Sequence, residues 1–468
     1  MMKNKFALFL LIGLTTFSFL SCFDDRDDEV IPSSTKEIQN FVWRGLNIYY
    51  LYKPNVPALQ RQTYANESEL DKFLKSFESP KTLFNNLIYK PEDRFSIIVS
   101  DYRELEKQLD GIRLSSGMKS GFMKLNSGEI YGYVRYVLPN TDAENKGIVR
   151  GMIFNRVNGS LITEDNYQTI LDPETITIDL VNFENDELVP SNQTITLNKQ
   201  EYNENPVFIK KTIDYANKKI GYLMYNAFTS IYDEELNNAF AYFKGEKVDD
   251  LIIDLRYNGG GSVETSNDLA SMVTGQFNGE LFTTQVYNDS DVFPDQKRYF
   301  NNKINTGETI NSLNLNKVYV ITTGSTASAS ELLIASLSPY IDVIQVGTTT
   351  RGKYQGSVTL YDSPNFSRTN ANIGHNYAMQ PLILKTVNAN GFTDYSEGLI
   401  PTIEVREEFS NLGELGNPNE TLLATTLNDL SFERKAPQQN NSKQIELIGQ
   451  SDMNQLDFQR MYINDFDY

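Results

Sequence analysis

The stretch VYVITTGSTASASELLIASLSPYIDVIQVGTTTRGKYQ runs from Val318 to Gln355 and decides the fold of the largest part of the chain. It begins with the apolar run Val318–Thr322, rich in β-branched residues, which predicts a buried strand. Small residues follow, and a helix is expected to begin near Glu331. Val343–Val346 predicts a second buried strand, so the stretch reads as a strand–helix–strand unit.

Two polar residues lie at the turns of this unit. Ser328 is expected on the strand-to-helix turn, where backbone N–H groups are free, and Lys353 in the polar loop after the second strand. A serine hydroxyl needs a base to become a nucleophile, and a lysine can serve once burial lowers its pKa. We therefore predict that Ser328 is a nucleophile and Lys353 its base. The alternative is that Ser328 is only a helix cap and Lys353 a solvated charge.

The motif A-S-A-S-E, followed by G-x-x-x-x-G-K, resembles the carboxyl-terminal processing proteases, which are serine peptidases with a Ser–Lys dyad. The family's nucleophile maps onto Ser328 and its lysine onto Lys353, 25 residues later. The resemblance extends over about residues 95–405. It implies an acyl-enzyme mechanism on an α/β core of the ClpP/crotonase type.

A second signature of that family, D-L-R-x-N-G-G-G, begins at Asp254 and ends at Gly261. Its glycines allow a sharp turn that exposes N–H groups at a helix start. The resemblance implies an oxyanion hole formed by the N–H groups of Gly261 and Ala329. A phosphate-binding loop is excluded, because neither G-K-[ST] nor G-x-G-x-x-G is present.

The third member of the catalytic group stays open in the sequence. The family often has a glutamine four residues past the lysine, but Ser357 occupies that position here, and Gln355 lies two residues past it. Either could orient Lys353. The chain's one histidine, His375, is expected to be incidental.

Residues 102–203 alternate as strands and turns, and a glycine-closed helix followed by a strand ending in V-N-G resembles a PDZ domain. Asn166–Leu171 would be the helix of its groove. Such a module binds an extended peptide at a sheet edge, and N–H groups of a loop hold the peptide's carboxylate. Gly121 and Phe122 are the candidates for that loop. The alternative is a purely structural β-module.

The N-terminus predicts a lipoprotein signal peptide. Lys3 and Lys5 precede the apolar run Phe6–Leu20, which is too short for a spanning helix. Cys22 follows this run and is the only cysteine, so its place resembles the lipidated cysteine of bacterial lipoproteins. The acidic residues 23–29 would form a solvated tether. This predicts a lipid-anchored protein of the cell envelope, facing the periplasm or the outer-membrane surface.

The fold class predicted from these parts is mixed α+β. The expected domains are a signal peptide over 1–22, a tether over 23–35, a helical cap over 36–101, the PDZ-like module over 102–205, the protease core over 206–434 and a mobile tail over 435–468.

Composition limits the partners. The chain has 468 residues and a formal net charge of −19, which disfavours nucleic acid as a partner. With one Cys and one His, it lacks the ligands of a Cys/His zinc site, and no cofactor is expected. The predicted function is a serine endopeptidase that acts on unfolded or C-terminally recognised polypeptides. The alternatives are a non-catalytic peptide-binding lipoprotein and a carbohydrate-binding lipoprotein with many Tyr and Phe residues. The oligomeric state stays open.

Overall fold

The computed structural model describes residues 31–184, 187–288, 293–409, 411–431 and 446–464. The predicted signal peptide, Cys22 and most of the acidic tether lie outside these ranges. Within the described residues, no helix is both long and apolar enough to cross a membrane.

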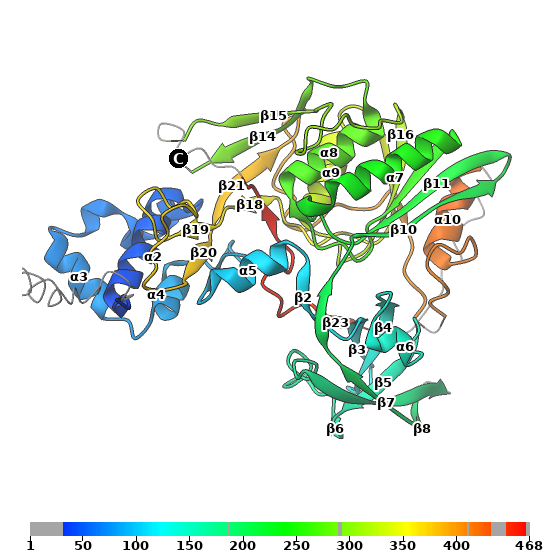
Figure 1. Ribbon diagram of the computed structural model, residues 1–468, viewed down its shortest axis with the longest axis horizontal. Coiled ribbons are helices and arrows are strands. Elements are labelled where there is room, and N and C mark those ends of the chain that lie inside the picture. The colour runs from blue at the N-terminus through cyan, green and yellow to red at the C-terminus, as the bar shows by residue number, and fades with distance from the viewer. Residues whose placement is uncertain (1–30, 185–186, 289–292, 410, 432–445, 465–468) are drawn as a thin grey trace, which may run out of the picture.

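The N-terminal part is helical, as predicted, and lies at one end of the molecule (Figure 1). Its helices are α2 (Thr35–Tyr49), α3 (Glu67–Lys75) and α4 (Pro80–Leu87), with 3₁₀ turns at Lys53–Asn55, Pro57–Leu59 and Arg61–Thr63. Ser34 caps α2 in a capping box with Glu37, which satisfies N–H groups at the helix start. The apolar faces of α2 and α4 continue into the main hydrophobic core of the protein.

The β-rich region over residues 102–203, called the PDZ-like module here only after the sequence prediction, forms a sheet with β23 in the order β23-β3-β4-β5-β7-β8, with β6 paired to β5. Its elements are α5 (Tyr102–Leu109), β2 (Ile112–Ser115), β3 (Met118–Lys124), β4 (Ile130–Val137), α6 (Asp142–Asn145), β5 (Ile153–Val157), β6 (Ser160–Leu161), β7 (Thr175–Glu184), β8 (Glu187–Asn198) and β9 (Gln200–Asn203). Strands β2 and β9 pair with each other where the chain enters and leaves the module. The module has its own apolar core.

The groove helix predicted over Asn166–Leu171 is wrong, because the structure has a run of turns there. The side chain of Asn166 accepts a hydrogen bond from the N–H of Thr163 at 2.8 Å and donates one to the carbonyl of Leu161 at 2.9 Å. An asparagine that bonds the local backbone in this way competes with a helix.

The protease core has a six-stranded sheet in the order β10-β11-β12-β16-β17-β22, parallel from β11 to β22. Its strands are β10 (Val207–Tyr215), β11 (Lys218–Tyr225), β12 (Asp250–Asp254), β16 (Lys317–Thr322), β17 (Asp342–Gly347) and β22 (Ile403–Glu404). Its helices are α7 (Asp233–Glu246), α8 (Val263–Thr274), α9 (Ala329–Leu337) and α10 (Thr421–Leu430), with a 3₁₀ turn at Ser230–Tyr232.

Both faces of this sheet are covered. In β12, Leu251 and Ile253 belong to the core shared with α7, α8 and α9, whereas Ile252 packs with α10 on the other face. Strand residues alternate between faces, so a sheet with helices on both sides is apolar throughout. For this reason Val318–Thr322 and Val343–Val346 are largely apolar runs in the sequence. Figure 1 shows α7, α8 and α9 on one side of the sheet and α10 on the other.

A second sheet has the order β13-β24-β18-β21-β14-β15. Its strands are β13 (Gly261–Ser262), β14 (Leu281–Tyr287), β15 (Gln296–Tyr299), β18 (Gln355–Ser357), β21 (Leu382–Val387) and β24 (Met461–Tyr462). A small third sheet joins β1 (Ile97–Val99), β20 (Ala378–Gln380) and β19 (Leu360–Tyr361), and so ties the N-terminal part to the core.

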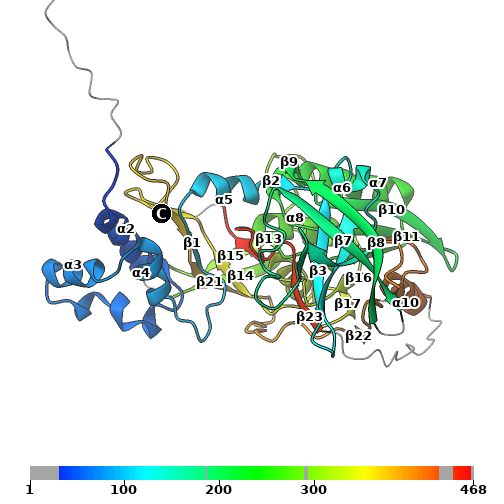
Figure 2. The same cartoon turned by 90° about the horizontal axis from the view of Figure 1, so that it is seen from below.

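The prediction of a mobile tail over 435–468 is wrong for residues 446–464. The structure forms β23 (Glu446–Gln450) on the PDZ-like sheet and β24 in the second sheet. The physical reason is burial: Met461 and Ile463 are 0% and 3% exposed and belong to the main core. Figures 1 and 2 show this red segment running between the PDZ-like module and the core.

Candidate active site

Ser328 lies on a sharp turn between β16 and α9. Its φ is 69° and ψ −118°, a conformation that a residue with a side chain adopts only under strain. Its side chain is fully buried, and its Oγ has no hydrogen-bond partner among the described residues. A serine on a strained strand-to-helix turn, with a free hydroxyl, is the arrangement expected of a nucleophile.

Lys353 is also fully buried. Its Nζ donates a hydrogen bond to the carbonyl of Gln459 at 2.7 Å and lies 4.8 Å from the centroid of the Phe95 ring. Burial lowers the pKa of Lys353 well below its usual value, and the nearby charge of Arg460 lowers it further. An amine of this kind can be neutral at physiological pH, as a general base must be.

Glu331 fixes the backbone of both residues. Its Oε2 accepts hydrogen bonds from the N–H of Ser328 at 2.7 Å and from the N–H of Lys353 at 2.9 Å. Its Oε1 accepts from the N–H of Gly352 at 2.7 Å and from the Thr350 hydroxyl. The two backbones therefore lie no more than two hydrogen-bond lengths apart, although 25 residues separate Ser328 and Lys353 in the chain. Sequence reasoning missed this role, although the E of the A-S-A-S-E motif is this glutamate.

The glycine loop after β12 packs against the Ser328 turn. Asn258 fixes the loop, because its Oδ1 accepts from the N–H of Gly260 at 2.8 Å and its carbonyl accepts from the N–H of Ala327 at 3.0 Å. A Cβ on Gly260 would lie 2.5 Å from the Ser328 Cβ and 2.9 Å from the Ala329 N. Gly260 therefore makes the close approach to Ser328.

Gly261 is the next residue and faces another neighbour. Its φ is 139°, and a Cβ there would lie 2.2 Å from the Phe228 carbonyl oxygen. Only glycine fits such an approach. The roles of Gly261 and Ala329 in an oxyanion hole stay predictions.

Neither candidate for the third member forms a hydrogen bond with Lys353 among the described contacts. The Gln355 amide donates to the Tyr52 hydroxyl at 2.9 Å, and the Ser357 hydroxyl donates to the Met461 carbonyl at 3.0 Å. The negative charges of Asp93 and Glu331 instead act on Lys353: they raise its pKa, against the larger effect of burial.

Asp93 holds a loop of the N-terminal part beside Lys353. Its carboxylate accepts from the Tyr50 hydroxyl at 2.8 Å and from the N–H groups of Phe95 and Ser96 at 2.9 and 2.8 Å. This loop places the Phe95 ring over the Lys353 Nζ, so the N-terminal part completes the site. Sequence reasoning did not predict this contact.

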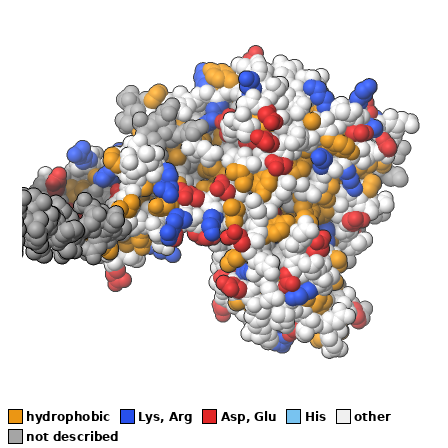
Figure 3. Space-filling view, viewed as in Figure 1, with side chains coloured by type: hydrophobic (Ala, Val, Ile, Leu, Met, Phe, Trp, Pro, Cys, Tyr) orange, Lys and Arg blue, Asp and Glu red, His pale blue; other side chains and the backbone are white. Residues whose placement is uncertain are grey.

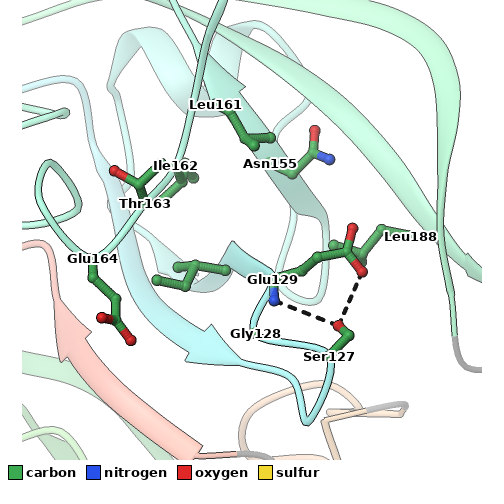
Figure 4. A pocket seen from close by; sticks show the side chains of 10 residues that line it. Ser127, Gly128, Glu129, Asn155, Leu161, Ile162, Thr163, Glu164 and Leu188 are labelled. Atoms are coloured by element: carbon green, nitrogen blue, oxygen red, sulfur yellow. Dashed lines mark hydrogen bonds between the residues drawn. The ribbon is translucent and has the colours of Figure 1, made fainter.

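The predicted peptide-binding residues lie on β3, which is the second strand of the PDZ-like sheet, next to the edge strand β23. Phe122 pairs with Gly449 and Gly121 with Gln450, both in β23. A hollow of about 360 Å³ lies elsewhere on the same module, between the β3–β4 turn and β6 (Figure 4). Its lining includes Glu129, whose Oε2 accepts a 3.0 Å hydrogen bond from the Ser127 hydroxyl. Neither Ser328 nor Lys353 lines this hollow.

No group of three or more His, Cys, Asp or Glu side chains among the described residues is arranged to hold a metal ion.

Parts of the chain match known peptidase families. Residues 219–387 match the model of peptidase family S41, and residues 37–97 match the peptidase S41 N-terminal domain. The carboxy-terminal processing protease CtpB of Bacillus subtilis is 21% identical over 385 residues, which cover 78% of this chain and 74% of CtpB.

Solved structures give the same assignment. A crystal structure of a putative S41 protease from Bacteroides fragilis is 26% identical with a TM-score of 0.66, covering 86% of this chain and 99% of that one. The photosystem II D1 C-terminal processing protease, 17% identical with a TM-score of 0.50, covers 85% of this chain and 99% of its own and shares the fold. The chain therefore contains a peptidase S41 domain over residues 219–387 and a peptidase S41 N-terminal domain over residues 37–97, and these matches support a serine peptidase.

Proposed function

We propose that the chain is an endopeptidase that uses Ser328 and Lys353 as a dyad. The observation that carries the proposal is the Glu331 carboxylate, which binds the backbone of a strained serine with a free hydroxyl and that of a buried lysine with a lowered pKa. One carboxylate thus fixes the backbone of both residues.

The reaction would follow acyl transfer. Lys353, as neutral amine, takes the proton of Ser328 Oγ while this oxygen attacks the peptide carbonyl. The ammonium then returns the proton to the leaving amine, and an acyl-enzyme remains. Water attacks the ester carbonyl, Lys353 takes its proton, and Ser328 is released with the new carboxylate. The N–H groups of Ala329 and the glycine loop would stabilise the oxyanion.

Lys353 has to leave its present partner to act. Its Nζ is bound to the Gln459 carbonyl, and a lysine stem has enough rotatable bonds to turn toward Ser328. The substrates would be polypeptides in extended form, recruited at the β3 edge by Gly121 and Phe122. We also propose lipidation at Cys22, which would place the enzyme on a membrane of the cell envelope.

Trapping the acyl-enzyme tests this proposal. A peptidyl electrophile should modify Ser328, as mapped by mass spectrometry, and the protein should degrade casein. Ser328→Ala should abolish both results. Ser330→Ala is the matched control, because Ser330 is a buried serine two residues away whose hydroxyl donates to the Asn258 carbonyl at 3.2 Å. Labelling elsewhere, or casein cleavage by folded Ser328→Ala protein, would contradict the proposal.

A further inference from the structure

The C-terminal segment, residues 446–463, lies along the two regions that the proposed function assigns to a substrate: strand β3 of the PDZ-like module and the neighbourhood of the dyad. Its first strand, β23, adds to β3 in antiparallel orientation and covers Gly121 and Phe122. Ile448 packs against the apolar core of the PDZ-like module. Backbone pairing at a sheet edge, with one side chain buried in the module, is the way such modules bind extended peptides.

The turn around Tyr167 closes the other side of this groove. Its ring lies 5.8 Å from the Phe122 ring, and a Cβ on Gly449 would lie 2.6 Å from the Tyr167 ring. Strand β23 therefore lies between β3 and the turn that stands where the groove helix was predicted. The segment occupies the position expected of a bound peptide.

Charged and polar contacts then lead the segment toward the Ser328 turn. The Gln450 Oε1 accepts hydrogen bonds from Arg135 at 2.7 Å and from the Ser325 hydroxyl at 2.9 Å, so it bridges the module and the turn. Further along, Lys119 pairs with Asp452 at 3.4 Å, and Arg113 pairs with Asp457 at 2.8 Å. Each of these ion pairs joins the module to the segment.

The end of the segment fills a slot beside the dyad. Strand β24 lies between β13 and β18, parallel to both, with Met461 opposite Gly261 and Tyr462 opposite Ser357. The carbonyl of Gln459 accepts the hydrogen bond of Lys353 Nζ, as described above. A Cβ on Gly260 would lie 2.8 Å from the Arg460 carbonyl oxygen. The segment thus presents backbone carbonyls to the base and to the glycine loop.

We propose that residues 446–463 occupy the path of the polypeptide substrate and act as an inhibitor within the same chain. This inference rests on the proposed function, because it assigns the groove at β3 and the slot between β13 and β18 to the substrate. While the segment is bound, Ser328 is fully buried and Lys353 is engaged by Gln459. A tethered segment competes as an intramolecular ligand, so substrates must displace it before cleavage.

Binding in trans tests the proposal without catalysis. The probe is a fluorescein-labelled peptide of the sequence ELIGQSDMNQLDFQRMYI, which is residues 446–463. The proteins are a Ser328→Ala chain that starts at residue 31 and the same chain ended at Lys435. The shortened chain should bind the peptide at least tenfold more tightly than the longer one, and a scrambled peptide should not bind. Equal affinities, or no binding by a shortened chain that unfolds cooperatively, would overturn the proposal.

A point variant covers the case in which the shortened chain does not fold. Ile448→Asp places a charge in the module's core and should release β23, raising casein cleavage at least fivefold in the full chain with Ser328 intact. Leu161→Asp is the control, because Leu161 is 44% exposed on β6 and should leave cleavage within twofold. Unchanged cleavage by folded Ile448→Asp protein would overturn the inhibitory role. Peptide binding with no casein cleavage by any variant would instead overturn the proposed function.

Discussion

The backbone N–H groups of the Ser328 turn and those of β3 have different kinds of hydrogen-bond partner: a side chain at the turn and another strand at β3. At the turn, the carboxylate of Glu331, three positions after Ser328, accepts hydrogen bonds from the N–H groups of Ser328 and Lys353. At β3, these groups are bound by a strand more than 300 residues away in the chain. The contacts at the turn span at most 22 residues of sequence, whereas those at β3 join distant parts of the chain. If the proposed inhibitor segment is displaced by substrates, the second set of contacts is exchanged while the first stays fixed.

The largest loss of activity is expected when Lys353, the proposed base, is replaced. Lys353→Met keeps the length of the side chain but removes the amine, so kcat/KM for casein should fall at least about 10³-fold. The protein should not lose stability, because an apolar side chain replaces a buried amine. Thermal unfolding and casein cleavage measure the two effects. Lys385→Met, at a half-exposed lysine on β21, is the control, and a similar loss of activity there would contradict the assignment.

The carboxylate at the Ser328 turn should be the next most sensitive group. Glu331→Gln replaces an oxygen acceptor with an NH₂ group, so at least one of its four donors loses its partner. We expect a loss of about 30-fold in kcat/KM and of roughly 2 kcal/mol in the free energy of unfolding. Denaturant titration and steady-state kinetics measure these changes. The exposed Glu308→Gln should change neither quantity, and unchanged kinetics in Glu331→Gln would refute its positioning role.

Asp268 is a second buried carboxylate, with fewer hydrogen-bond donors than Glu331, and its protonation should make the stability of the protein depend on pH. Burial raises the pKa of Asp268 to about 8; one oxygen accepts from Asn301 and the other has no partner among the described residues. The folded pKa lies above the unfolded value, so this group's contribution to stability is complete below about pH 4 and is lost as pH rises through 8.

Replacing that carboxylate should therefore stabilise the protein only at high pH. Asp268→Asn should gain about 5 kcal/mol in the free energy of unfolding, relative to wild type, between pH 4 and pH 9, with most of the gain before pH 8. Urea titrations at pH 4, 6, 8 and 9 measure the difference. A difference that does not change with pH would show that Asp268 titrates normally.

The smallest effect is expected where the two regions meet. Gln450→Ala removes the side chain that accepts from Arg135 and from Ser325 beside the turn. The loss of about 1 kcal/mol should appear as faster amide hydrogen exchange in β23, with β4 unchanged. Glu446→Ala, at an exposed position of the same strand, is the control. Equal exchange in both variants would show that Gln450 does not link the regions.

The sequence predicted the parts of this protein whose signals are local. The apolar runs of β16 and β17, the small residues before α9 and the glycines after β12 placed Ser328, Lys353 and the loop beside them, because each pattern reflects the conformation of its own segment. Asn166 shows how a local signal can also mislead, since its side chain makes two hydrogen bonds to the backbone where a helix was expected.

The tertiary structure decided which residues surround Lys353 and how they change its pKa. The polar composition after residue 435 indicated a tail without structure, yet three apolar residues, Ile448, Met461 and Ile463, pack against the apolar cores where two strands pair with neighbouring sheets. The Phe95 ring, the Arg460 charge and the Gln459 carbonyl reach Lys353 from opposite ends of the chain. Composition and periodicity describe neighbours in sequence, whereas the pKa of a buried lysine depends on neighbours in space, and only the folded chain brings these together.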